Sequence, residues 1–537
     1  MNARFALVAI LVASASTAVW AADPQPTRPA IQVTMRDMAK ISAHWQESIY
    51  ATVWKDPALA SIRSKLVPDG IQAPDVFSVV EMLSDMTAID WRWLGMRLDS
   101  FGNPSNATSF CGDFGAYAEA VERQARSSWY TDLIEPRSIA GADSAVANRD
   151  EVLARFGSTV VAMPSRSTSI APWKIPAHEG DLSVRIDLRA MLESARSISN
   201  GDALAQLDAG VRSLGPLLTT IDQRFEIVPE GILQRWRIDA AVPGLAPVER
   251  EVLARLPGNT LTVLAVGIDG RSLWAKGRKP VMEWINGGDP TGAKRAAQES
   301  EQAIDQRLTA LHFDFSLSDL VTSFRGTVFV AFTPAAPVPA ITLAFPRSRP
   351  CDALVDWFLT AMKQKVPAEG GQHPLVLPNV PVQLIAARDR GHWLITSDGA
   401  LATSWLGGKV GGWQQSAAGA LTLSKAAPGS CMLGSSDTPA VLRLASAFLK
   451  PVINASPGLD PADKVGISQA LARLAELASP GYLVAGFDQG RLAGEARGVI
   501  GNLVIPALWT GVALGDADKK RASEVDAHDP LNDDPLK

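Results

Sequence analysis

The sequence predicts an α+β protein built from two diverged copies of one module, each an antiparallel β-sheet with helices packed on one side. Three observations lead to this fold class. Apolar residues recur at helical spacing near the N-terminus, they alternate with polar residues from mid-chain onward, and similar segments occur in the same order in both halves. Hairpin signals between the strands favour antiparallel sheets.

The first residues have the three parts of a secretory signal peptide. Arg4 supplies a positive charge, residues 5–12 form an unbroken apolar run, and Val19 and Ala21 occupy positions −3 and −1 of the expected cut. We therefore predict an exported protein of the periplasm or cell envelope, cleaved after Ala21. The polar, Pro-rich residues 22–30 then form a linker.

Two helices are predicted after this linker. Apolar side chains recur at steps of three and four along the first, at Met38, Ile41, Trp45 and Ile49. One face of this helix is therefore apolar, and the helix ends near Trp54. Asp56 is expected to cap the second helix, with Pro57 at its first position. Its buried stripe is predicted to be Leu59, Ile62 and Leu66.

Strands are predicted from mid-chain onward, by alternation or by short apolar runs. They cover residues 182–188, 225–227, 232–238, 261–268, 328–332, 382–387 and 392–396. Turn signals at residues 229–231 and 388–391 join four of them into two hairpins. Residues 286–303 are interpreted as a loop that enters a helix.

Four pairs of similar segments occur in the same order in both halves. They begin at Phe77 and Phe315, at Cys111 and Cys351, at Asp150 and Asp398, and at the hairpin glycines Gly231 and Gly490. Their shared order predicts two copies of one module. Chance alignment of strand and helix patterns is the alternative.

The chain is divided accordingly. We predict a signal peptide over residues 1–21, a linker over 22–30, a first α+β module over 31–241, a second over 248–511 and a disordered acidic tail over 515–537. Two prolines and a glycine in residues 242–247 interrupt any strand or helix and mark the joint. The tail has almost no large apolar side chains to bury.

Composition excludes some partners and limits crosslinks. The net charge is −5, so no broad basic surface exists to neutralise a nucleic-acid backbone. Three cysteines are too few for a disulfide framework. Cys351 and Cys431 could pair, and the alternative is that all three cysteines are small buried apolar residues.

Catalytic motifs are missing from the sequence. It contains neither the G-x-S-x-G elbow nor the S-x-x-K pair of serine nucleophiles. No two of the six histidines have a helical ligand spacing, so they are interpreted as solvated loop or edge residues. The glycines of residues 287–292 do not complete a phosphate-binding loop, because Ala293 precedes Lys294. We predict no catalytic, cofactor-binding or metal-ligating residue and no cofactor.

Two features keep other functions open. Fifteen tryptophans could include some that stack on sugars, although Trp45, Trp91, Trp93 and Trp357 lie in apolar periodic stretches and are interpreted as core. The run from Val499 to Leu514 is apolar but short for a bilayer, and it contains Asn502 and Pro506. We expect it to pack against the second module, with membrane anchoring left open.

Three segments carry a resemblance to other sequences. They are the pattern from Trp45 to Leu59 with Ser48, Tyr50, Trp54, Asp56 and Pro57, the run from Leu256 to Leu264, and the run from Phe324 to Val330 followed by Pro-rich turns and Cys351-Asp352. In these segments the chain resembles exported bacterial proteins of unknown function. The resemblance implies an α+β module with antiparallel strands and carries over no catalytic residue.

Three functional hypotheses follow. The first is a non-catalytic envelope protein that presents a groove or sheet face to a protein, peptide or lipid. The second is a carboxylate-based hydrolase of envelope polysaccharide, because Asp, Glu and Trp are abundant. The third is a membrane-tethered accessory subunit that uses residues 499–514. Two carboxylates facing each other in a Trp-lined cleft would favour the hydrolase.

Overall fold

The computed structural model describes a large part of the chain. It covers residues 30–36, 38–60, 92–98, 108–127, 134–148, 151–165, 171–172, 180–188, 190, 218–240, 242–278, 290–335, 339–376, 383–456 and 459–498. The predicted signal peptide, the segment that begins at Phe77, the apolar run 499–514 and the tail 515–537 lie outside these residues.

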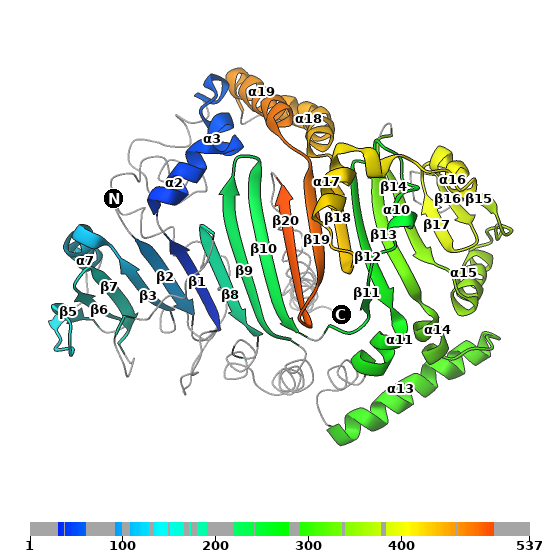
Figure 1. Ribbon diagram of the computed structural model, residues 1–537, viewed down its shortest axis with the longest axis horizontal. Coiled ribbons are helices and arrows are strands. Elements are labelled where there is room, and N and C mark those ends of the chain that lie inside the picture. The colour runs from blue at the N-terminus through cyan, green and yellow to red at the C-terminus, as the bar shows by residue number, and fades with distance from the viewer. Residues whose placement is uncertain are drawn as a thin grey trace, which may run out of the picture.

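The strands within these ranges join into one continuous antiparallel sheet that runs across the whole molecule (Figure 1). Following the pairings from one edge, the order is β4 (Glu135–Pro136), β5 (Ser144–Ala147), β6 (Glu151–Phe156), β7 (Thr159–Pro164), β3 (Thr108–Asp113), β2 (Trp93–Leu98), β1 (Ile31–Arg36), β8 (Leu182–Asp187), β9 (Leu218–Val228) and β10 (Gly231–Ala240). It continues with β20 (Arg491–Gly498), β19 (Gly481–Asp488), β18 (Ser430–Ser436), β12 (Thr262–Asp269), β13 (Arg325–Thr333), β14 (Ala340–Pro346), β17 (His392–Thr396), β16 (Leu384–Arg388) and β15 (Gly371–Leu375).

The connections between strands supply the helices. In the first half these are α2 (Met38–Glu47), α3 (Ile49–Trp54), η1 (Pro57–Leu59), η3 (Gly115–Tyr117) and α7 (Ala118–Ser127). In the second half they are α10 (Arg250–Leu253), α11 (Gly270–Ser272), η4 (Leu273–Gly277), α13 (Pro290–Ala310), α14 (Leu317–Ser323), α15 (Arg349–Ala361), α16 (Gly399–Leu406), η5 (Trp413–Gln415), α17 (Ala417–Lys425), α18 (Thr438–Ala455) and α19 (Pro461–Leu477).

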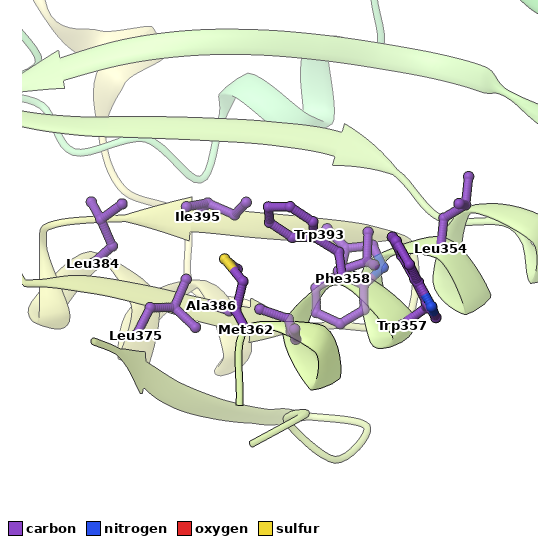
Figure 2. A pocket seen from close by; sticks show the side chains of 11 residues that line it. Leu354, Trp357, Phe358, Met362, Leu375, Leu384, Ala386, Trp393 and Ile395 are labelled. Atoms are coloured by element: carbon purple, nitrogen blue, oxygen red, sulfur yellow. The ribbon is translucent and has the colours of Figure 1, made fainter. Parts of the chain in front are cut away.

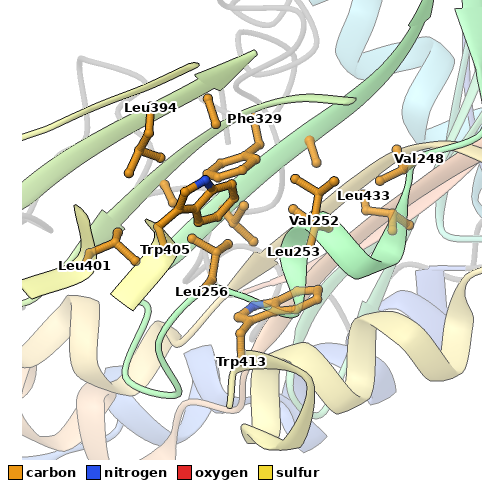
Figure 3. Close-up of a cluster of buried hydrophobic side chains, with 14 of the residues drawn as sticks. Val248, Val252, Leu253, Leu256, Phe329, Leu394, Leu401, Trp405, Trp413 and Leu433 are labelled. Atoms are coloured by element: carbon orange, nitrogen blue, oxygen red, sulfur yellow. The ribbon is translucent and has the colours of Figure 1, made fainter. Parts of the chain in front are cut away.

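The largest core lies between one sheet face of the second half and the helices α10, α16 and α17. Trp405, Trp413 and Phe329 are almost completely buried there, with Leu253, Leu256, Leu394 and Leu433 around them (Figure 3). Burying a large apolar side chain contributes about 1.5–3 kcal/mol, so this cluster is the main support of the second half.

The opposite face of the second half is covered by α15. Successive residues of a strand point to opposite faces, and in β17 Leu394 joins the Trp405 core while Trp393 packs with Leu359 of α15. In the second half, helices therefore cover both faces of the sheet. The sequence analysis predicts helices on one face alone. Alternation shows that a strand has two faces, but a strand that is apolar on both, such as residues 392–396, gives no sign of which helix covers each.

Several local predictions agree with the structure, and two differ from it. The hairpins β9–β10 and β16–β17 and the strands β8, β12 and β13 form where alternation and turn residues predict them. The predicted first helix is broken at Ser48, whose hydroxyl accepts from Ala51 N and donates to Trp45 O, so Ser48 caps α3. The predicted joint at residues 242–247 contains β11 (Leu245–Ala246), which pairs with β12.

The segment pairs that suggested a repeat fall on different elements in two cases. Gly231 and Gly490 both end the turns of hairpins, β9–β10 and β19–β20. Cys111 lies inside strand β3, whereas Cys351 lies in helix α15. Residues 151–154 form part of β6, whereas residues 399–402 begin α16. These two matches are wrong, because short helical and strand patterns resemble each other without tertiary context.

The order of strand pairing is nevertheless the same in the two halves. It reads β5-β6-β7-β3-β2-β1-β8-β9-β10 in the first half and β15-β16-β17-β14-β13-β12-β18-β19-β20 in the second. The last strands of the two series, β10 and β20, pair with each other. Helices of the two halves also meet, because Ile49 of α3 packs with Leu442 of α18 and Leu474 of α19.

Candidate functional site

A groove of about 410 Å³ lies between helix α15 and the strands β15, β16 and β17 (Figure 2). Every side chain that lines it is apolar: Leu354, Val355, Trp357, Phe358, Leu359, Met362, Leu375, Leu384, Ala386, Trp393 and Ile395. This volume is within the range of small-molecule sites, most of which add a few polar groups for orientation. The lining of this groove offers aliphatic, aromatic and thioether surface.

Helix α15 forms one wall of the groove. Ser348 caps it by accepting from Cys351 N, and Pro350 occupies its first turn, where a missing N–H costs nothing. Leu359 faces inward and is buried, whereas Phe358 is 55% exposed and Trp357 is 41% exposed. Large aromatic side chains with this much exposed surface are typical of interaction sites rather than of a closed core.

The strands form the other wall. Trp393 and Ile395 are two residues apart on β17 and so point to the same face, toward α15 (Figure 2). The indole N–H of Trp393 donates to Oδ1 of Asp352 at 2.8 Å. This bond holds a completely buried ring at the base of the groove.

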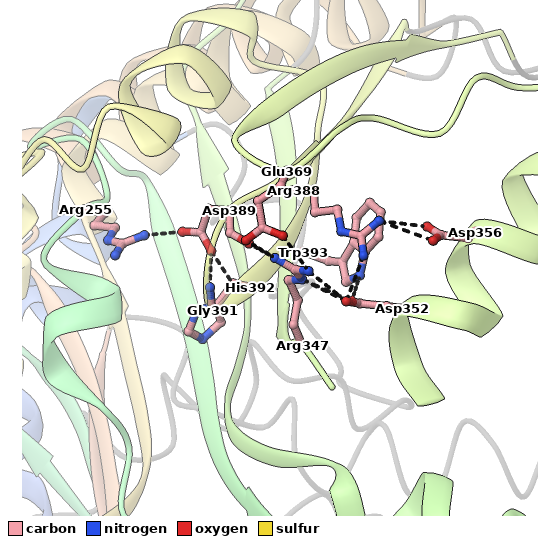
Figure 4. A network of polar contacts seen from close by, with 10 residues as sticks. All are labelled: Arg255, Arg347, Asp352, Asp356, Glu369, Arg388, Asp389, Gly391, His392 and Trp393. Atoms are coloured by element: carbon pink, nitrogen blue, oxygen red, sulfur yellow. Dashed lines mark hydrogen bonds and ion pairs between the residues drawn. The ribbon is translucent and has the colours of Figure 1, made fainter. Parts of the chain in front are cut away.

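An ion-pair network lies beside the groove (Figure 4). Asp352 of α15 accepts from Arg347 at 2.8 Å and from Arg388 at 2.9 Å. Arg388 also contacts Asp356 at 3.2 Å, and Arg347 contacts Glu369 at 3.1 Å. Each charge of this network therefore has a partner of opposite sign, and the network holds α15 to the β16–β17 hairpin.

The pKa of Asp352 is set by two opposing effects. Burial raises it, but hydrogen bonds from Arg347 and Trp393 and the positive charges of Arg347 and Arg388 outweigh burial, so the pKa lies below its ordinary value. A carboxylate with a lowered pKa and its oxygens engaged by three donors is a poor proton acceptor. The network therefore has the chemistry of a structural clamp.

A second polar cluster lies at the β16–β17 turn (Figure 4). Asp389 accepts from the backbone N–H groups of Gly391 and His392 and from Arg255. The ring of His392 is buried against Trp405, and its Nε2 lies 3.9 Å from Glu249. Burial lowers the pKa of His392, although Asp389 and Glu249 oppose this shift.

Several residues lie elsewhere than the sequence predicts. The sequence interpretation has His392 solvated, but it is buried. Trp357 is interpreted as core, but it is partly exposed. Trp45 is buried as predicted, and all three cysteines are buried free thiols. Helical spacing identifies the apolar face of α15, but it cannot show that Trp357 and Phe358 stay partly exposed. No signal in the sequence points to the groove.

Among the residues that the structure describes, no cluster of histidine, cysteine, aspartate or glutamate side chains could hold a metal ion. Within the same residues, every helix is too short or too polar to span a bilayer. Comparison of the chain with protein-family models, with curated proteins and with solved structures gives no match in any of the three.

Proposed function

We propose that the protein is a non-catalytic, exported protein of the cell envelope that binds an apolar ligand in the groove between α15 and the β15–β17 strands. The observation that carries this proposal is the entirely apolar lining of the groove. The signal-peptide pattern of residues 1–21 supports export. The absence of carboxylates from the lining favours binding over polysaccharide hydrolysis, which needs two of them in one site.

A fluorescence experiment tests the binding. The mature protein is titrated with 1-anilinonaphthalene-8-sulfonate, whose emission rises in an apolar site. Phe358→Asp places a charge at the exposed mouth of the groove and should weaken binding at least tenfold, because it removes apolar contact area and its carboxylate repels the sulfonate of the dye. Phe448→Asp on α18, where the side chain is 44% exposed and outside the groove, is the matched control and should bind normally. Equal loss in both variants would contradict the proposal.

We also propose that residues 31–241 and 248–511 are diverged copies of one module. The identical pairing order of their strands supports this, with β10 and β20 joining the copies. A shared ion pair supports it as well. Arg155 of β6 contacts Glu122 of α7 at 3.0 Å, and Arg388 of β16 contacts Asp352 of α15 at 2.9 Å.

The two arginines occupy matching places. Arg155 pairs across the sheet with Ser144 of β5 and Val160 of β7, and Arg388 pairs with Gly371 of β15 and Trp393 of β17. Superposition of an experimental structure on itself, half on half, tests the proposal. If β9–β10 superpose on β19–β20 but β1–β3 do not superpose on β12–β14, the two halves are not copies of one module.

A further inference from the structure

The groove does not end at Ile395 but continues as a row of apolar side chains across the sheet. Each member is the direct cross-strand partner of the next, in the order Ala386, Ile395, Leu343, Val330 and Leu264. Direct partners share one face of a sheet. The row runs from β16 through β17, β14 and β13 to β12, which is four strand spacings or about 19 Å.

The far end of the row is open. Leu264 is 42% exposed, and two neighbours on the same face, Phe332 and Ile341, are 39% and 43% exposed. Phe332 and Ile341 pair directly across β13 and β14, and Phe332 lies two residues along the same face from Val330, the direct partner of Leu264. Contiguous exposed apolar surface of this kind marks an interaction site more often than isolated residues do.

We propose that the groove and this row form one binding site, and that its occupant is a single long hydrocarbon chain of a lipid lying across the strands. This inference rests on the proposed function and names the class of ligand. A hydrocarbon chain needs no hydrogen-bond partner along its length, and it gains affinity in proportion to the apolar area that it covers. The length of the row and the apolar lining meet both conditions.

The edge of the sheet argues against a peptide as the occupant. A peptide that binds beside a groove of this kind usually adds a strand to the sheet edge and pairs through its backbone. Strand β15 lies at this edge, and Pro374 within it lacks a backbone N–H. The side-chain amide of Gln364 occupies both backbone groups of Val376, accepting from its N–H at 2.9 Å and donating to its C=O at 2.9 Å.

The ion-pair network beside the groove supplies no net positive charge to an anionic membrane surface. The two guanidinium groups beside the groove, Arg347 and Arg388, are paired with the three carboxylates of Asp352, Asp356 and Glu369. Two positive and three negative charges leave this network without the excess of cations that attracts anionic lipid headgroups. The hydrocarbon chain of the lipid would therefore enter the groove while the lipid headgroup stays in water.

A chain-length series tests the inference. Octanoate, laurate and palmitate, each below its micelle concentration, are titrated calorimetrically into the mature protein. Because the headgroup is constant, affinity should rise about fourfold for each added methylene that the site covers. Leu264→Gln, at the far end of the row, should lower the affinity for palmitate at least tenfold and leave the affinity for octanoate unchanged. Ile341→Gln is the second variant, in case the first does not fold, and Phe448→Gln on α18 is the control.

The possible results separate the inference from the proposed function. If octanoate and palmitate bind equally and Leu264→Gln changes neither, the row is not part of the site, although the groove still binds apolar ligands. If neither fatty acid binds and the naphthalene dye also fails to bind, the proposed function itself is wrong. If the protein binds phosphatidylglycerol vesicles but no monomeric fatty acid, the occupant is a membrane surface and the inference is overturned.

Discussion

Trp236 lies over Gly494 where the two halves of the sheet meet. The two residues are direct partners in the β10–β20 pair, and a Cβ atom at position 494 would lie 1.5 Å from the Trp236 ring. The indole therefore takes the space that a side chain at 494 would fill. It packs with Ile238, Ala485, Leu492 and Cys431, so the seam between the halves has an apolar core of its own.

Gly494→Ala should destabilise the protein by about 2 kcal/mol, because the added methyl group forces the Trp236 ring to move within a packed cluster. Gly498→Ala in the same strand is the matched control, since no atom lies within 4 Å of the added carbon there. Urea unfolding of both variants measures the effect. Equal midpoints for the two would show that the ring is free to move.

Asp352→Ala should destabilise the protein by about 3 kcal/mol, because it leaves Arg347 and Arg388 without their shared partner in a largely buried site. Asp314→Ala removes the carboxylate of an exposed pair with Arg349 and should cost under about 0.5 kcal/mol. Thermal unfolding followed by circular dichroism compares them. A loss at Asp314 as large as that at Asp352 would contradict the structural role of the network.

Mild acid should destabilise the protein through His392. Its pKa is lowered by burial from an ordinary value of 6.5, so the unfolded chain binds a proton more readily than the folded one. The stabilisation is therefore complete above pH 6.5 and is lost as the pH falls through the lowered pKa. The free energy of unfolding, measured by urea titration at pH values on both sides of 6.5, should fall toward the acid side.

The variant His392→Gln isolates this effect. It should show a smaller decrease in stability with acid than the wild type, because the titrating ring is gone. His373→Gln, on strand β15, is the matched control for the substitution itself. An unchanged slope in His392→Gln would assign the acid sensitivity to another group.

The three thiols should resist modification in the folded protein. All are buried, and burial, aided by the charge of Asp352, raises the pKa of Cys351 to about 11, so little reactive thiolate forms near neutral pH. Ellman's reagent should label the native protein slowly and all three thiols after unfolding in urea. Labelling of a single thiol after unfolding would instead reveal a disulfide.

Protein recovered from the envelope of an expressing bacterium should begin at Ala22. The reason is that the charge, apolar run and small residues of positions 1–21 have the pattern of a signal peptide. N-terminal sequencing checks this prediction. Intact protein that begins at Met1 and stays in the cytoplasm would contradict the assignment of a signal peptide.

Much of the secondary structure could be predicted because its signals are local. The alternation in β8, the turn at Gly231 and the cap at Asp56 each depend on residues within a few positions of one another. The backbone there follows from side-chain spacing, turn geometry and hydrogen bonds to neighbouring N–H groups, all of which the order of residues specifies.

The groove could not be predicted, because it depends on what lies next to α15. The spacing of Trp357, Phe358 and Met362 marks an apolar helix face, and a buried face would have the same spacing. Only the packing of α15 on β15–β17 shows which of these side chains stay exposed. The same holds for His392, which is buried in the folded protein with its ring against Trp405.

The residues along the chain thus specified the strands and their turns, while the tertiary structure decided how the strands pair. Strand β10 bonds to β20, and Arg235 meets Glu495 across 260 positions of sequence. No local pattern encodes such a partner, because any strand with suitable alternation offers the same backbone groups. The choice depends on burying Trp236 over Gly494 and on closing all other pairings at once, which is a property of the whole fold.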